Sequence, residues 1–346
     1  MQFWRQCYTV AWVVVLGVAG QAWAAPAWNA PTTVIGPYIK EQADLMKAAP
    51  TAAAAKAIRD DIELGLKPPK ETGSPPPAWK SEYSQSVAKY FKPLVTEKAN
   101  GVGLNAIILI ADMKDTWCDD ALVTALGDAK SSPAVRYWAA RGLAGILPEL
   151  KPIPPAFKRA VDALSVAAAK ETSPLAKAEM LRAMKATGHA PFAAQALATL
   201  QATAAAFAKN APTPYDMELA AASAEALTGL IADGATLNKA DATAAAQAAA
   251  DIMSFPAQYL VKAAQDKTQT VSGNQITEAY NLAQSALKVV TALAPGKTLE
   301  LKKLPAGGKA TADDLLSLVN DVTGSQADPS KIQALFPDVK APARIK

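Results

Sequence analysis

The sequence predicts an all-α fold, and three observations carry that prediction. Alanine supplies roughly 22% of the 346 residues, and it is the strongest intrinsic helix former. Apolar residues recur at helical spacing in runs that are separated by short breaks, and no pair of alternating segments indicates a β-hairpin. Three of these breaks place a hydroxyl residue directly before a proline at nearly equal intervals, which is typical of a repeated helical unit.

The near balance of basic and acidic residues indicates which classes of binding partner are improbable. The chain has 35 basic and 31 acidic residues, a net charge of +4 and 51% hydrophobic residues. A disordered polyelectrolyte has a larger net charge and fewer apolar residues, and a nucleic-acid-binding domain usually carries a strong excess of Lys and Arg. We therefore expect a folded chain whose partner is not a nucleic acid.

Residues 1–24 have the three parts of a secretory signal peptide. Arg5 gives a basic start, an apolar stretch covers residues 10–20, and Ala22 and Ala24 supply the small residues that precede a cleavage site. We expect cleavage after Ala24 and export to the periplasm, the cell envelope or the medium. Retention as an anchor is the alternative, although about 11 apolar residues are fewer than the roughly 20 that span a bilayer as a helix. No integral membrane segment is expected after cleavage.

The exported chain begins with a helical segment, residues 25–66. Its two helical runs, Tyr38–Ala48 and Thr51–Leu66, are separated by a proline, and Thr51 is a suitable N-cap, so we expect a helical hairpin. Residues 67–78 are rich in proline. Because proline lacks an amide donor and restricts the residue before it, this stretch predicts a stiff linker.

Residues 79–295 form the predicted body, which is a series of helices with short breaks. The predicted helices are Trp79–Lys98, Leu104–Met113, Asp119–Leu126, Pro133–Leu147, Pro155–Lys170, Pro174–Thr187, Pro191–Lys209, Tyr215–Ile231, Lys239–Asp266 and Ile276–Leu293. Pro256 lies inside one of them and predicts a kink or a break. Residues 296–346 are expected to hold a linker and short helices.

Pro133, Pro174 and Pro214 are the regularly spaced prolines, separated by 41 and 40 residues. Proline suits the first helical turn, and the hydroxyl residue before it can cap the free amides. About 40 residues is the length of a two-helix solenoid repeat. Alignment on the prolines also superposes two apolar stripes, Val135, Ala139 and Leu143 on Ala176, Met180 and Met184.

Residues 128–147 resemble the second half of a HEAT-like repeat. The matching positions are the proline of the turn, a Val-Arg pair, paired alanines and a leucine, which are Pro133, Val135-Arg136, Ala139-Ala140 and Leu143. Asp119–Leu126 corresponds to the first helix of that repeat. The resemblance implies an all-α fold in which residues 79–295 form an α-solenoid of degenerate HEAT-like helical pairs. It also implies an elongated face that binds other macromolecules, and it implies no catalytic residue.

The residue types that usually perform catalysis are scarce. His189 is the only histidine, and Cys118 is the only cysteine outside the signal peptide. We expect His189 to lie in an exposed turn and Cys118 to be buried and unreactive; the alternative for Cys118 is an exposed thiol. Asp119-Asp120 and Asp313-Asp314 lie at predicted helix starts, where carboxylates interact favourably with the helix dipole. No spacing typical of a metal, nucleotide or nucleophile motif occurs, so we expect no cofactor and no metal.

Tyr137, Trp138 and Arg141 are the candidate interface residues. Trp, Tyr and Arg dominate the binding energy of many protein interfaces, and these three lie within one predicted helix. The alternative places Trp138 in the core, with Arg136 and Arg141 paired to turn acids such as Asp128.

Three functions remain open on this evidence. We expect a non-enzymatic exported scaffold or protein-binding module with a protein partner. The alternatives are an enzyme or enzyme accessory with a carboxylate-based site, and a structural envelope protein that associates with itself.

Overall fold

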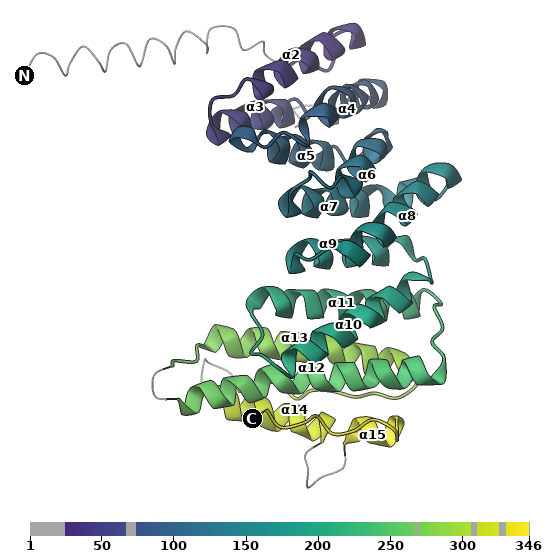
Figure 1. Cartoon of the computed structure of the whole chain (residues 1–346). Helices are drawn as coiled ribbons and strands as arrows, with labels where there is room; N and C mark the ends of the chain where they lie inside the picture. Colours follow the sequence, from purple (N-terminus) through teal and green to yellow (C-terminus); the bar gives the residue numbers. More distant parts are fainter. Residues whose placement is uncertain (1–24, 67–73, 267–268, 306–309, 325–329, 346) are drawn as a thin grey trace, which may run out of the picture. The chain divides into compact units, whose positions relative to one another are not determined.

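The computed structural model describes residues 25–66, 74–266, 269–305, 310–324 and 330–345. The predicted signal peptide and most of the proline-rich stretch lie outside these ranges. Within them the chain contains fourteen α-helices, α2 to α15, four short 3-10 helices and no β-strand, so the all-α prediction is confirmed (Figure 1). None of the described helices combines the length and apolar character that a membrane span needs.

The chain divides into two compact units, Met1–Met113 and Lys114–Lys346, which we call unit 1 and unit 2. The sequence analysis separates a hairpin, residues 25–66, from a body that starts at residue 79. In the structure the first two helices of that body pack on the hairpin within unit 1. The division therefore falls between Met113 and Lys114, and the proline-rich stretch lies inside unit 1.

Four α-helices form unit 1: α2 (Ile35–Lys47), α3 (Ala52–Leu64), α4 (Pro77–Phe91) and α5 (Val102–Asp112). Helix α2 packs on α3 and α4, and α5 packs on the same two helices. The Thr51 hydroxyl accepts a hydrogen bond from the Ala54 amide, which confirms the predicted N-cap of α3.

The core of unit 1 is aromatic as well as aliphatic. Trp79 and Tyr83 on α4 are buried and stacked, with ring centroids 4.7 Å apart. The Tyr83 hydroxyl donates a 2.8 Å hydrogen bond to the Ile62 carbonyl near the end of α3. This contact joins two helices that flank the proline-rich stretch.

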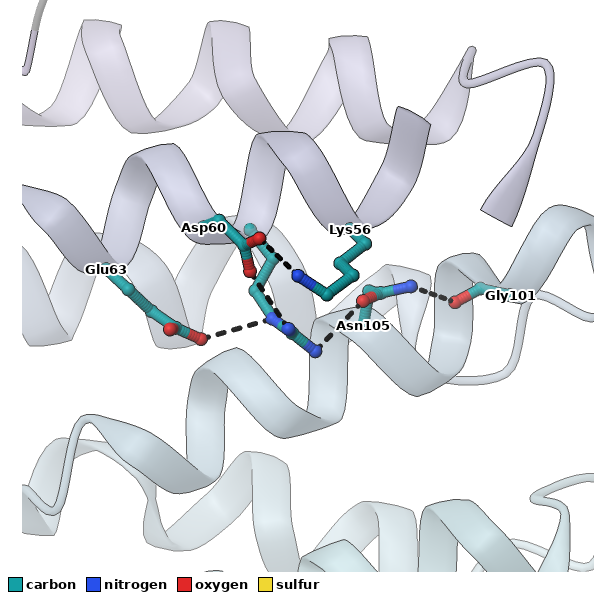
Figure 2. A network of polar contacts seen from close by, with 6 residues as sticks. Lys56, Asp60, Glu63, Gly101 and Asn105 are labelled. Carbon is teal, nitrogen blue, oxygen red and sulfur yellow. Dashed lines mark hydrogen bonds and ion pairs between the residues drawn. The ribbon is translucent and has the colours of Figure 1, made fainter. Parts of the chain in front are cut away.

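A polar network joins α3 to α5 in unit 1 (Figure 2). Arg59 donates to the Asn105 side-chain oxygen at 3.1 Å and pairs with Asp60 at 2.9 Å and Glu63 at 3.2 Å. The Asn105 amide in turn donates to the Gly101 carbonyl at 3.0 Å. Asn105 thus orients the arginine, and the network fixes the rotation of α3 against α5.

Unit 2 holds ten α-helices. They are α6 (Asp119–Gly127), α7 (Pro133–Leu150), α8 (Pro154–Lys170), α9 (Pro174–Thr187), α10 (Phe192–Phe207), α11 (Pro214–Ala232), α12 (Lys239–Gln265), α13 (Gly273–Leu293), α14 (Ala312–Thr323) and α15 (Lys331–Leu335). Helices α7, α9, α11 and α13 form one row in which each packs on the next. Helices α6, α8, α10, α12 and α14 form a second row, and the two rows pack together (Figure 1).

Alanine makes this close packing possible. Small side chains at contact positions let helix axes approach to about 8 Å, the lower end of the usual range. Helix α11 buries Ala220, Ala222, Ala224 and Ala226, and α12 buries six alanines between residues 245 and 257. The predicted stripe of Val135, Ala139 and Leu143 on α7 is also buried, as expected for residues that face neighbouring helices.

Two of the three predicted hydroxyl caps are present. Ser132 accepts from the Val135 amide, and Thr213 forms a reciprocal capping box with Asp216. The Ser173 side chain forms no cap on α9, so that prediction is wrong. The Glu171 carboxylate instead accepts from the Thr172 and Ser173 amides just before α9, at 2.9 and 2.8 Å.

Pro256 does not break α12, which continues from Lys239 to Gln265. The residue is fully enclosed, and α12 packs on α10, α13 and α14 around it. Packing on three sides outweighs the hydrogen bond that a proline removes. Helix α7 also contains a proline, the exposed Pro148, and it runs past its predicted end at Leu147 to Leu150.

Candidate protein-interaction surface

The three candidate interface residues lie together on α7. The rings of Tyr137 and Trp138 meet edge to face with centroids 5.8 Å apart. The Arg141 guanidinium lies over the Trp138 ring, 4.8 Å from its centroid. The two rings are half-buried and Arg141 is exposed, so the cluster presents an aromatic and cationic surface to solvent.

The alternative interpretation of this cluster is wrong in two respects. Trp138 is at the edge of the core and not enclosed by it. Arg136 does pair with a turn acid, but this acid is Glu171, between α8 and α9, and not Asp128, whereas Arg141 contacts Trp138. The sequence analysis chose a nearby acid, whereas the row of helices brings a carboxylate from 35 residues away to Arg136.

The pair of Arg136 and Glu171 links the start of α7 to the start of α9. Arg136 donates to both carboxylate oxygens, at 2.6 and 3.1 Å, and to the Ser131 carbonyl at 2.5 Å. The Glu171 side chain is fully buried, and burial alone would raise its pKa. The guanidinium and the Ser173 and Thr172 amides outweigh burial and hold the pKa of Glu171 below its ordinary value.

A second pair links α9 to α11. Arg182 on α9 pairs with Glu179 on its own helix at 3.1 Å and with Glu218 on α11. Arg182 is eight residues after Pro174, as Arg141 is eight residues after Pro133. The repeated position places the two arginines on corresponding sides of α7 and α9.

We call the solvent-facing side of the first row the α7–α13 face. Its members are Tyr137, Trp138 and Arg141 on α7, Leu175 and Arg182 on α9, Tyr215, Glu218 and Glu225 on α11, and Glu278 on α13. Cationic and aromatic side chains are at its α7 end. Carboxylates predominate at its α11 and α13 end.

A groove of about 460 Å³ lies at the acidic end of this face. Leu175 and Tyr215, which directly follow Pro174 and Pro214, line it with 38% and 60% of their surface exposed. Glu218, Glu225 and Glu278 line it as well. A large exposed apolar surface beside charged groups is a usual property of a binding site.

This groove was not among the features predicted from the sequence. The signal was present, because Leu175 and Tyr215 occupy the same position after aligned prolines. It was missed since an apolar residue in the first turn of a helix resembles the start of a buried stripe. Only the packing of α9, α11 and α13 shows that this position faces solvent.

The residues considered for chemistry are placed as predicted. His189 is exposed between α9 and α10, with its ring 5.4 Å from that of Phe192. Cys118 is fully buried, and burial, followed by the nearby Asp115 and Asp119, raises its pKa to about 12. Asp119 lies in the first turn of α6, where it pairs with Arg159 at 2.5 Å.

The other expectation at a helix start also holds, because Asp314 forms a capping box with Thr311 at the beginning of α14. Across the described part of the chain, no group of three or more His, Cys, Asp and Glu side chains could hold a metal ion. Comparison with protein-family models, with curated proteins and with solved structures gave no match.

Proposed function

We propose that the chain is an exported, non-enzymatic protein-binding module, in which unit 2 is an α-solenoid of HEAT-like helical pairs and the α7–α13 face binds a protein partner. The groove on that face is the observation that supports this most directly. It combines exposed apolar surface from Leu175 and Tyr215 with three carboxylates in one hollow. The two rows of helices and the interval of about 40 residues support the solenoid.

The chemistry of the groove favours a partner segment with an apolar residue beside a basic one. The apolar residue would cover Leu175 and Tyr215, and the basic residue would pair with Glu225 or Glu278. The aromatic cluster at the other end of the face offers Trp138 and Arg141 as anchors for a carboxylate or aromatic group. A partner that spans both ends would cross all four helices of the row.

The test is affinity capture from the native envelope fraction, with the chain from Ala25 onward as bait. Two bait variants alter the face: Tyr137→Ser with Arg141→Gln, and Tyr215→Ser with Glu225→Gln. Lys158→Gln on α8 is the matched control, because its side chain is 76% exposed and belongs to the other row. Quantitative mass spectrometry measures the proteins that each bait retains.

We expect at least one protein to be retained by the unaltered chain and by the control, and to be reduced at least ten-fold with both face variants. Equal retention by all four baits would show that the α7–α13 face is not the binding surface. Light scattering of the purified chain over a hundred-fold concentration range distinguishes a binding module from a protein that associates with itself. A mass that rises with concentration favours a self-associating envelope protein over a module for a separate partner.

A further inference from the structure

The last described residues of the chain lie extended along α12. Gln247 binds the main chain of Lys340 twice: its Nε2 donates to the Lys340 carbonyl at 3.2 Å, and its Oε1 accepts from the Lys340 amide at 2.8 Å. Eleven residues along the helix, Gln258 donates to the Ala343 carbonyl at 3.0 Å and accepts from the Ile345 amide at 2.9 Å. A side-chain amide used in this way mimics the edge of a β-strand.

The spacing of the two glutamines matches an extended chain. Eleven helical residues rise about 16 Å at 1.5 Å each. The five residue steps from Lys340 to Ile345 extend about 16 Å at 3.3 Å each. Gln247 and Gln258 therefore contact a segment in the extended conformation in register, whereas a helical segment of the same length would reach only about half as far.

Both glutamines are also oriented by α12 itself. The Gln247 Nε2 donates to the Asp251 carboxylate at 3.1 Å, and the Gln258 Nε2 donates to the Ser254 hydroxyl oxygen at 2.9 Å. Each partner is one helical turn away, and neither belongs to the extended segment. The recognition groups are thus held in position by the helix, which lowers the entropy cost of binding a chain there.

The four contacts between the glutamines and the segment involve main-chain atoms only. Lys340, Ala343 and Arg344 are exposed, so their side chains do not determine the fit. A cavity of about 490 Å³ between α12 and α14 adjoins the segment, and Val261 and Leu316 line it together with Ile345. An extended chain of another sequence could make the same four contacts and place an apolar side chain in this cavity.

Val339, which directly precedes the segment, is anchored in the core. That side chain is 2% exposed, and its carbonyl accepts from the Gln333 Nε2 at 2.9 Å. Beyond it the hydrogen bonds to Gln247, and that from Gln258 to Ala343, are exposed to solvent, and exposed hydrogen bonds contribute little net free energy. Residues 340–345 can therefore leave α12 without disturbing the core below Val339.

We propose that the α12 surface marked by Gln247 and Gln258 is a binding site for an extended polypeptide segment of another protein, and that residues 340–345 occupy it as an intramolecular ligand. This site is separate from the α7–α13 face, and the proposal does not depend on the function proposed for that face. Because the tail is tethered, its effective concentration is in the millimolar range. A segment from another protein must displace it.

The first experiment measures fluorescence anisotropy of a labelled peptide with the sequence Lys340–Lys346. The proteins compared are the full chain and the chain that ends at Val339, each checked for helical circular dichroism and cooperative unfolding. We expect the shortened chain to bind at least ten-fold more tightly. Gln258→Ala in the shortened chain should weaken binding at least five-fold, whereas Gln201→Ala, an exposed glutamine on α10, should leave it unchanged.

Modified peptides separate main-chain recognition from adventitious binding. N-methylation at Ile345 removes the amide that Gln258 accepts from, so we expect at least a five-fold loss of affinity. N-methylation at Ala341, which neither glutamine contacts, should have less than a two-fold effect. Equal affinity of the two proteins for the peptide, or equal effects of the two N-methyl groups, would overturn the proposal.

A second measurement uses the full chain and remains decisive if the shortened chain fails to fold. Hydrogen exchange at the Ile345 amide should be slower than in the free peptide, and Gln258→Ala should return it to the free rate. An excess of the unlabelled peptide should also speed this exchange. If exchange at Ile345 is already as fast as in the free peptide, the tail does not occupy α12 and the proposal fails.

Discussion

Asp251 on α12 is a carboxylic acid whose charged form is disfavoured by burial. Burial raises its pKa from the ordinary 3.8 to about 6, and the hydrogen bond from Gln247 compensates only partly. Between about pH 4 and pH 6 the folded chain therefore holds a proton that the unfolded chain has released. Because the folded state binds more protons in this interval, Asp251 makes folding less favourable as the pH rises through it.

Asp251→Asn should remove this penalty and keep the acceptor for Gln247. We expect the substitution to raise the free energy of unfolding at pH 7.5 by on the order of 2 kcal/mol, and to change it little at pH 4. Urea unfolding of both proteins at the two pH values measures this. Asp162→Asn, an exposed carboxylate on α8, serves as the control and should show no such gain at pH 7.5. An equal effect of Asp251→Asn at both pH values would contradict the assignment.

Single residues could be placed from the sequence when their partners are close in the chain. Tyr137, Trp138 and Arg141 were predicted as a cluster because they share one helix, and Cys118 was expected to be unreactive because acidic residues flank it. The partner of Arg136 could not be predicted. Thirty-five residues separate it from Glu171, and only the packing of α7 on α9 brings the two together.

At the scale of helices, local signals predicted where α7, α9 and α11 begin. Proline in the first turn of α7, α9 and α11 marks the helix starts within one residue of the predictions. At Pro256 a proline predicted a kink or a break, and α12 does not break there, because its interior packs on three neighbouring helices. Signals for a helix start are local in physical origin, whereas the survival of a helix across a proline depends on tertiary packing.

The link between α7 and α9 depends on a buried carboxylate, so its loss should be costly. Arg136→Met leaves the Glu171 carboxylate buried without its guanidinium, and we expect a loss of about 3 kcal/mol in unfolding free energy at pH 7. The double variant with Glu171→Gln should recover part of this loss. Urea unfolding of the two single variants and the double variant gives the coupling energy.

The pH dependence of the stability loss in Arg136→Met follows from the lowered pKa of Glu171. A carboxylate with a depressed pKa stabilises the folded state above the ordinary pKa of about 4.3 and loses this effect as the pH falls. The difference between Arg136→Met and the unaltered chain should therefore shrink below about pH 4. A difference that stays constant from pH 7 to pH 3 would show that Arg136 acts through packing and not through charge.

At the scale of the molecule, the division into units was the hardest feature to infer. A run of prolines suggests a linker, but the residues on its two sides can still pack together. Here Trp79 and Tyr83 follow the proline-rich stretch and are buried in unit 1 with α2 and α3. Such contacts between separated helices leave no periodic trace in a single sequence.

A boundary at residue 79 and a boundary between Met113 and Lys114 predict different behaviour of protein fragments. Residues 114–346 form unit 2, so this fragment should be helical and unfold cooperatively in urea. Residues 79–346 carry α4 and α5 without their partners, which exposes Trp79 and Tyr83. We expect this longer fragment to bind a hydrophobic dye and aggregate, as measured by fluorescence and light scattering. A longer fragment that behaves as well as the shorter one would contradict the division at Met113.

The tail contact also has a consequence for the order in which unit 2 forms. Neighbouring helices of the rows meet after short stretches of chain, so they can assemble as the polypeptide emerges during synthesis. The bonds between Gln247 and Lys340 span 93 residues, so α12 is made well before the segment that covers it. The surface of α12 therefore stays open until residues 340–345 have been made, and any other extended segment nearby can meet it before they do.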